Sequence, residues 1–343
     1  MEDYKEGSQA AESDSQKDRW VKVRVPGTSA NCGPGFDCLG VACTIYNELE
    51  LKLLSEKKLI IEVSGDGAGN IPTDERNIVW RSIQKLLVKA GKDKEYQGAM
   101  IRMHNDVPLS RGLGSSATAI VGGLKAANEY LGNPFSRRDL LQMATDIEGH
   151  PDNVAPAIFG GFTVSIVRNG KPECFSLMPR LNIKLVVAVP DFFLPTKAAR
   201  AVLPTEVSMQ DAVFNIGRAA MLTAALCKGN KSFLRSVFDD ALHQPYRAKL
   251  IPGMYDVFKA AKSAGALGAS MSGAGPCLIA FTLDNPEAVG EAMCQAFKAN
   301  KVEACYHVFD IDRFFFFGLF HPFHGKDFVL QQIFFQILLQ LRL

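Results

Sequence analysis

Two periodicities of apolar and polar residues run along the chain, and together they predict both strands and helices. Residues 20–27 (WVKVRVPG) alternate apolar with polar side chains and stop at Pro-Gly, which is typical of a strand that enters a turn. Apolar side chains recur at positions 117, 120, 121, 124, 127 and 131, which is helical spacing. Strands cluster early in the chain, and helices prevail from about residue 193. This order predicts an α+β protein with two lobes.

The same patterns predict the remaining elements and the domain boundaries. Further strands are expected at 48–55, 59–65, 99–110, 181–191 and 302–312, and another follows Gly160-Gly161. Further helices are expected at 76–91, 136–149, 210–229, 234–243, 254–265 and 286–301, and a glycine-rich turn at 266–281 runs into a strand. We expect a leader at 1–19, an N-terminal domain at 20–175, a C-terminal domain at 176–313 and a tail at 314–343.

Composition and charge narrow the class of partner. The chain has 38 Lys and Arg against 36 Asp and Glu, a net charge of +2, so bulk charge gives no reason to expect a nucleic acid. Residues 1–19 are polar and lack the apolar core of a secretory signal, which favours a disordered leader. No stretch of 18 apolar residues occurs, so no membrane span is expected. The eight cysteines form no CxxC pair, which favours buried, reduced thiols and a cytoplasmic location.

The composition changes abruptly after Asp312. The last 31 residues, which begin at Arg313, contain nine phenylalanines and no turn chemistry suited to an exposed tail. The final apolar segment (IFFQILLQLRL) is too short to span a bilayer. It could form an oligomer-contact helix or strand, or it could be residues without a selected role.

A glycine- and serine-rich loop precedes the helix predicted around 117–131 and indicates an anion site. Backbone N–H groups at a helix N-terminus have no intrahelical partner, and the helix dipole adds partial positive charge there. Glycines let the main chain approach an anion, and serine hydroxyls can contact phosphate oxygens or Mg²⁺. We interpret the loop as a binding site for nucleotide phosphates; the alternative is a glycine turn with a serine N-cap. It comprises Pro108, Leu109, Ser110, Arg111, Gly112, Leu113, Gly114, Ser115, Ser116, Ala117 and Thr118.

Two further glycine-rich loops lie at 33–40 and 273–275. The second can place small residues and main-chain N–H groups beside another part of a ligand, or it can be a plain turn between a helix and a strand. The chain has no GxxxxGK[ST] motif, which excludes a Walker A site, and no dinucleotide-type GxGxxG follows the first strand.

Polar residues with catalytic potential concentrate in two places. The first is Glu148, His150, Asp152 and Asn153. One carboxylate there could ligate Mg²⁺, which prefers oxygen ligands, and a second could accept a proton from an attacking hydroxyl. The alternative is a capped helix C-terminus followed by a polar loop, and zinc is disfavoured because no nearby Cys or second His offers ligand spacing.

The second place is basic. It comprises Thr196, Lys197, Arg200 and, further along the chain, Arg247. Guanidinium groups bind carboxylates bidentately, so these residues could hold an acidic ligand; the alternative is solvated surface charge.

Taken together, the three loops resemble those of the GHMP small-molecule kinases, named for galactokinase, homoserine kinase, mevalonate kinase and phosphomevalonate kinase. PLSRGLGSSAT (108–118) is similar to the family's phosphate loop, and SMSGAGPC (270–277) is similar to its C-terminal glycine motif. PGTSAN (26–31) with the following GPGFDCLG, HPDNVAP, TKAAR and PYR (245–247) resemble the branch that phosphorylates homoserine. The resemblance covers about residues 20–313. It implies a ribosomal-protein-like N-terminal lobe with a left-handed βαβ crossover and a ferredoxin-like C-terminal lobe.

The resemblance also implies the cofactors and the nucleotide site. ATP and Mg²⁺ would be the cofactors, and the protein would be a homodimer. The backbone from Gly112 to Ser116 would wrap the ATP phosphates, and Ser116 and Glu148 would hold Mg²⁺. Asn77 would lie near the adenine.

For the acceptor, the resemblance implies L-homoserine, phosphorylated on its hydroxyl as a step of threonine biosynthesis. Asn31 and Asp37 would face its amino and hydroxyl end, and Asp152 is the candidate base, with Asn153 available to orient the hydroxyl. Carboxylate binding and closure of the pocket would fall to Thr196, Arg200, Arg247, Ser270 and Gly273. The alternatives are a GHMP kinase with another small alcohol as acceptor and a catalytically silent ligand-binding protein on the same scaffold.

Overall fold

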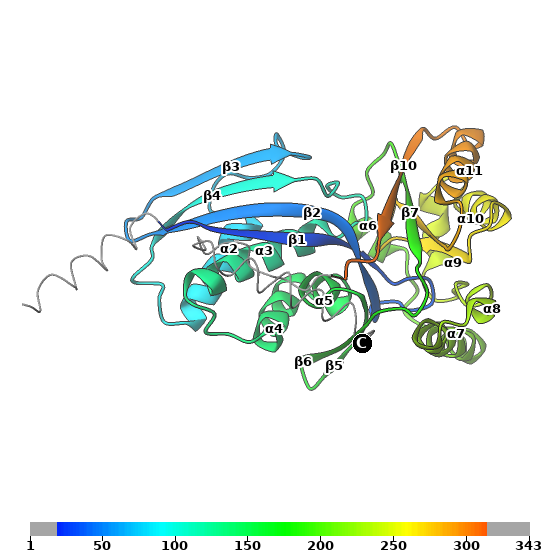
Figure 1. Ribbon diagram of the computed structural model, residues 1–343, viewed down its shortest axis with the longest axis horizontal. Coiled ribbons are helices and arrows are strands. Elements are labelled where there is room, and N and C mark those ends of the chain that lie inside the picture. Colours follow the sequence, from blue (N-terminus) through cyan, green and yellow to red (C-terminus); the bar gives the residue numbers. More distant parts are fainter. Residues whose placement is uncertain (1–18, 314–343) are drawn as a thin grey trace, which may run out of the picture.

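The computed structural model describes residues 19–313, and the expectations for the leader and the tail therefore lie outside the described residues, apart from Arg19. The described chain forms two lobes, each built on its own sheet (Figure 1). The N-terminal sheet contains β1 (Val21–Ala30), β2 (Leu39–Leu54), β3 (Leu59–Gly65), β4 (Gly98–Asn105), β5 (Phe162–Arg168) and β6 (Lys171–Leu177).

The long strand β2 organises the N-terminal sheet. β1 pairs antiparallel along one of its edges, with a register shift between Pro26 and Gly27. On the other edge, residues 47–54 pair with β4 and residues 39–41 pair with β5. β3 and β4 are parallel neighbours joined through α2 (Ile78–Lys89), which is a βαβ unit. The left-handed crossover stays a prediction.

Four helices cover one face of this sheet: α2, α3 (Ser115–Tyr130), α4 (Arg137–Glu148) and α5 (Pro151–Phe159) (Figure 1). The first residues of β1 alternate buried and exposed, so Val21, Val23 and Val25 point into the core beneath the helices. α3 is buried along most of its length, and Gly123 allows it to approach α2, because a Cβ there would lie 2.6 Å from Val79 O.

The C-terminal sheet has the strand order β10-β7-β9-β8, and all of its pairs are antiparallel. It consists of β7 (Lys184–Pro190), β8 (Gly268–Met271), β9 (Leu278–Thr282) and β10 (Ala304–Asp310). Across the sheet, β9 lies between β7 and β8, and β10 pairs with the other edge of β7. This order of the four strands is a ferredoxin-like arrangement. The helices of this lobe are α6 (Thr196–Ala201), α7 (Met209–Lys228), α8 (Lys231–Leu234), α9 (Gln244–Arg247), the 3₁₀ turn η1 (Ala248–Leu250), α10 (Met254–Ser263) and α11 (Pro286–Ala299).

The α+β, two-lobed prediction is confirmed, and three local predictions are wrong. The strand at 20–27 was expected to stop at Pro26-Gly27, but β1 continues to Ala30 with a register shift at that point. Residues 234–243 were expected to be a helix, but only Leu234 is helical and the rest is irregular. Side-chain oxygens of Asp240 and Asn215 accept the backbone N–H groups of residues 241–244, which gives this segment partners other than helical carbonyls. The region 266–281, expected to begin as a turn, begins with strand β8.

The two lobes meet where the loops at 31–37, 108–118 and 273–277 contact one another, and we call this contact region the seam. Gly273 N donates to Ala30 O at 3.1 Å, and Cys277 N donates to Arg111 O at 3.1 Å. The chain passes from the first sheet to the second between the ends of β6 and β7, and the exact domain boundaries stay a prediction. Within residues 19–313, no helix is both long and apolar enough to cross a membrane.

Candidate active site

A cavity of about 370 Å³ between the lobes gathers most of the residues singled out in the sequence. Its walls come from the seam loops, from the N-terminal ends of α3 and α5, and from the C-terminal lobe. The predicted residues that line it are Asn31, Asp37, Leu109, Ser110, Gly112, Gly114, Ser115, Ser116, Glu148, Asp152, Asn153, Thr196, Arg200, Arg247 and Gly273.

The loop at 108–118 delivers the N-terminus of α3 to this cavity. Gly114 is the N-cap and adopts φ 69°, the left-handed region that favours glycine. The first intrahelical bond runs from Thr118 N to Gly114 O, so the N–H groups of Ser115 and Ser116 have no intrahelical partner and lie at the cavity. A Cβ on Gly114 would lie 2.0 Å from Thr28 Oγ1, which explains why a larger residue does not fit. The geometry suits an anion.

Other residues of the loop support it from behind. Leu113 and Ala117 are fully buried, and the Thr118 hydroxyl accepts from Asn47 Nδ2 at 2.9 Å. The Arg111 guanidinium donates to Pro190 O and lies 4.9 Å from the ring centroid of Phe193, so it binds the C-terminal lobe. Pro108 also does not line the cavity. The loop therefore offers its backbone and serines, rather than Arg111, to a ligand.

Ser116 and Glu148, predicted to share a metal ion, lie in direct contact. Ser116 Oγ donates to Glu148 Oε2 at 2.8 Å, and both side chains line the cavity. Burial raises the pKa of Glu148, and the hydrogen bond from Ser116 opposes that shift. The arrangement presents two adjacent oxygen atoms beside the N-terminus of α3, a pair that could ligate a metal ion.

His150, Asp152 and Asn153 lie at the start of α5, and Asn153 lies beside Gly114 of the 108–118 loop. Asp152 is 2% exposed and contacts His150 Nδ1 through Oδ1. Burial alone would lower the pKa of His150, yet the hydrogen bond and charge of Asp152 raise it above its usual value. Asn153 Oδ1 accepts from Thr28 Oγ1 at 2.9 Å, so the amide N–H groups of Asn153 are the donors it can offer to a ligand.

The loop at 31–37 forms the adjoining wall. Asn31 and Asp37 adopt φ of 70° and 55°, a region in which Asn and Asp are favoured among residues with a side chain. Asn31 Nδ2 donates to Gly273 O at 2.8 Å, and Asn31 Oδ1 accepts from Asp37 N at 3.0 Å. Arg200 donates to both carboxylate oxygens of Asp37, at 2.9 and 3.2 Å. Arg200 was predicted to hold a ligand carboxylate, and here it is paired with Asp37.

Arg247 lies in the same wall and is 2% exposed. Its Nε donates to Ala199 O at 3.0 Å and its Nη1 lies 3.4 Å from Gly273 O, while Nη2 has no hydrogen-bond partner recorded among residues 19–313. Burial, together with the nearby charge of Arg200, lowers the pKa of Arg247 to about 10, so it stays cationic at neutral pH. It is an oriented cation at the cavity wall.

Outside the 108–118 loop, two predicted ligand residues do not line the cavity. Ser270 is fully buried in β8, and its hydroxyl has no hydrogen-bond partner among the described residues. Its neighbour Ser272 instead closes the seam, donating to Gly112 O at 2.6 Å. Asn77 is the N-cap of α2 and accepts from Val79 N, a structural role that needs no ligand.

Several lining residues were not predicted. They are Asn47, Asn70, Ile71, Pro72, Arg76, Ile78, Met103, Asn105, Ala119, His150 and Leu194, whereas Ala274 and Gly275 belong to the predicted 273–275 loop. Five of these lining residues come from 70–78, a segment that carries no recognisable motif. The only sequence feature that pointed to this segment was Asn77, whose two neighbours in sequence line the cavity. His150 had been noted within its polar cluster without a role.

Family models match both lobes. The model described as the GHMP kinases N terminal domain matches residues 77–161, and that of the GHMP kinases C terminal matches residues 221–299. The first range contains the phosphate loop and the Glu148–Asn153 cluster, and the second contains Arg247 and the 273–275 loop. The fold and the site define a GHMP kinase.

Similar proteins place the chain in one family within the GHMP kinases. The chain is 48% identical over 284 residues to a homoserine kinase of Carboxydothermus hydrogenoformans, covering 83% of this chain and 92% of the relative. It is 50% identical over 274 residues to a homoserine kinase of Gloeobacter violaceus, covering 79% and 91%. A crystal structure of homoserine kinase from Cytophaga hutchinsonii matches with a TM-score of 0.78 at 35% identity, covering 85% of this chain and 96% of that one. The chain belongs to the homoserine kinase family.

Proposed function

We propose that the protein transfers the γ-phosphoryl group of ATP to the side-chain hydroxyl of L-homoserine, giving O-phospho-L-homoserine in threonine biosynthesis. The observation that carries this is the single cavity in which an anion-binding helix N-terminus faces an acidic and a basic side chain, Asp37 and Arg247. An amino acid with a free hydroxyl has the matching ammonium and carboxylate groups. The homoserine kinase relatives support the same reaction.

The phosphates of ATP would bind at the loop before α3. The free N–H groups of Ser115 and Ser116 and the positive end of the helix dipole would neutralise part of their charge. Ser116 and Glu148 would hold Mg²⁺, since their oxygens are in contact and both line the cavity. When bound there, Mg²⁺ would neutralise charge on the phosphate oxygens.

Homoserine would bind between the 31–37 loop and the two arginines. The free Nη2 side of Arg247 would receive its carboxylate, with Thr196 and Arg200 alongside. Asn31 and Asp37 would face the amino and hydroxyl end. Because the guanidinium of Arg200 is already paired with the carboxylate of Asp37, Arg247 would make the larger contribution to binding the homoserine carboxylate.

Phosphoryl transfer through a loose transition state needs positioning and charge neutralisation more than a strong base. Asp152 is the candidate proton acceptor, and its Oδ1 contacts His150 Nδ1. Asn153, held by Thr28, would orient the hydroxyl through its amide N–H groups.

A coupled assay of ADP release tests the proposal. Homoserine, threonine, mevalonate and galactose are compared as acceptors at saturating Mg²⁺ and ATP, and homoserine should give the highest kcat/KM. No turnover with homoserine would refute the proposal, and turnover with another acceptor would assign the chain to a different alcohol. Tight ATP binding by calorimetry without ADP release would instead favour a catalytically silent protein.

Two further properties belong to this proposal. We expect a homodimer, as the family resemblance implies, which light scattering tests directly. We also expect a cytoplasmic location, because all eight cysteines are free thiols in the structure and several are buried.

A further inference from the structure

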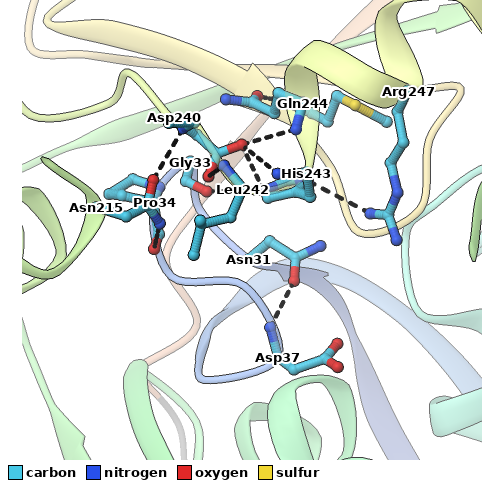
Figure 2. A network of polar contacts seen from close by, with 12 residues as sticks. Asn31, Gly33, Pro34, Asp37, Asn215, Asp240, Leu242, His243, Gln244 and Arg247 are labelled. Atoms are coloured by element: carbon cyan, nitrogen blue, oxygen red, sulfur yellow. Dashed lines mark hydrogen bonds and ion pairs between the residues drawn. The ribbon is translucent and has the colours of Figure 1, made fainter. Parts of the chain in front are cut away.

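A cluster of polar side chains lies behind the cavity wall formed by the 31–37 loop and Arg247, which we call the acceptor wall (Figure 2). At its centre is His243, which is fully buried and precedes the short helix α9. His243 Nε2 lies 2.8 Å from Gly33 O, and His243 Nδ1 lies 3.4 Å from Arg247 Nη1. One imidazole thus connects the 31–37 loop of the N-terminal lobe to the arginine of the C-terminal lobe.

Hydrogen-bond chemistry fixes the protonation state of this ring. A carbonyl oxygen only accepts, so Nε2 carries the hydrogen that is donated to Gly33 O. A guanidinium only donates, so Nδ1 carries no hydrogen and accepts from Arg247. His243 is therefore neutral in this arrangement, consistent with burial, which lowers its pKa. No other protonation state satisfies both contacts.

Asp240 holds the backbone that carries His243. One carboxylate oxygen, Oδ2, accepts from His243 N at 2.9 Å and from Gln244 N at 2.7 Å, and Oδ1 accepts from Leu242 N at 3.1 Å. Oδ2 also lies 3.5 Å from His243 Nε2. With three backbone N–H groups bound, the turn before α9 has little freedom to rotate the imidazole away.

The opposite side of the ring is held as well. Phe36 stacks on His243 with centroids 5.1 Å apart, and the Arg247 guanidinium lies 5.2 Å from the centroid of Phe36. Asn215 Nδ2 donates to Pro34 O at 2.7 Å, which ties the same loop to α7 (Figure 2). Because Phe36 and His243 both contact Arg247, a shift of the ring would be transmitted to the guanidinium.

We propose that His243 is a positioning residue for homoserine recognition: through Nδ1 it orients Arg247, and through Nε2 it anchors the 31–37 loop. It does not line the cavity, so it acts through these partners and not on the substrate itself. The proposal rests on the proposed function, in which Arg247 receives the homoserine carboxylate.

Three substitutions separate the two contacts. His243→Asn keeps an acceptor near the Nδ1 position, His243→Gln keeps a donor near the Nε2 position, and His243→Phe removes both while keeping an aromatic ring against Phe36. Thr282→Val is the matched control: Thr282 is a fully buried polar residue of the same lobe whose hydroxyl donates to Asp284 O, away from the cavity. KM for homoserine, KM for ATP and kcat are measured for each, with a thermal melt.

We expect His243→Phe to raise KM for homoserine roughly tenfold or more, the effect of losing a hydrogen bond to a charged group, with KM for ATP nearly unchanged. His243→Asn should restore part of the loss, and His243→Gln should restore less of it. Thr282→Val should lower the melting temperature without changing either KM.

Equal changes in the two KM values, or melting changes without kinetic ones, would overturn the proposal and leave His243 a structural residue. Should His243→Phe fail to fold, the Asn and Gln variants decide the question by the same comparison. Failure of the proposed function is distinguished by the parent protein, which would then not phosphorylate homoserine at all.

Discussion

Replacing Arg247 with alanine should weaken homoserine binding and leave ATP binding unchanged. Arg247 is 2% exposed, and its bonds to Ala199 O and Gly273 O fix the direction of the guanidinium. Removing one member of a buried, hydrogen-bonded charge pair costs about 2–4 kcal/mol. This corresponds to a roughly 30- to 1,000-fold fall in kcat/KM for homoserine. Loss of the donor to Ala199 O should also lower the free energy of unfolding by about 1–3 kcal/mol, whereas Gly273 O keeps its bond from Asn31 Nδ2.

The assay measures initial rates of ADP formation with one substrate varied and the other saturating. Arg235→Ala serves as the control, because Arg235 is an exposed arginine of the same lobe that does not line the cavity. It should change neither KM. If Arg247→Ala raised both KM values by the same factor, or left KM for homoserine unchanged, the carboxylate role would be refuted. Urea unfolding of each variant separates lost binding from lost folding.

Three further outcomes are expected. Gly114→Ala should introduce about 1–3 kcal/mol of backbone strain as well as contact with Thr28, so a thermal melt should show destabilisation and KM for ATP should rise; an unshifted melt contradicts this. Because the pKa of His150 is raised above its unfolded value, its stabilising contribution is complete below the unfolded pKa and is lost as pH rises through the folded pKa. Asp152→Asn should remove this pH dependence of the free energy of unfolding, measured by urea unfolding at several pH values. The same pH dependence in the parent protein and the variant would contradict the expectation. A chain ending at Arg313 should keep kcat and both KM values, since all lining residues of the cavity precede it; lost activity would assign the tail a role.

The place of the 112–116 loop at a helix N-terminus could be predicted because its signal is local. Gly112, Gly114 and the two serines after them are adjacent in sequence, and backbone rules alone place them at a helix N-terminus. The α+β class followed in the same way from the change in periodicity along the chain. Both features depend on residues that are adjacent in sequence, so the sequence shows them directly.

The support behind the acceptor wall could not be predicted, because its contacts are distant in sequence. His243 lies in a segment whose apolar spacing predicts a helix, and the carboxylate of Asp240 overrides that preference by binding three backbone N–H groups. Its partner Gly33 is 210 residues away. The prediction for Ser270 shows the converse: the 273–275 loop that follows it lines the cavity, but Ser270 itself is a buried residue of β8 and does not.

The seam between the lobes has a consequence for how ligands exchange. The 273–277 loop is hydrogen-bonded to Ala30 and to Arg111 of the 108–118 loop, so parting the lobes would break bonds in the floor of the site itself. Entry and exit are then left to the exposed segments at the rim, where Asn70 and Thr196 lie on opposite lobes. Ligand exchange would accordingly require movement of these exposed segments and would leave the hydrogen bonds between the lobes intact.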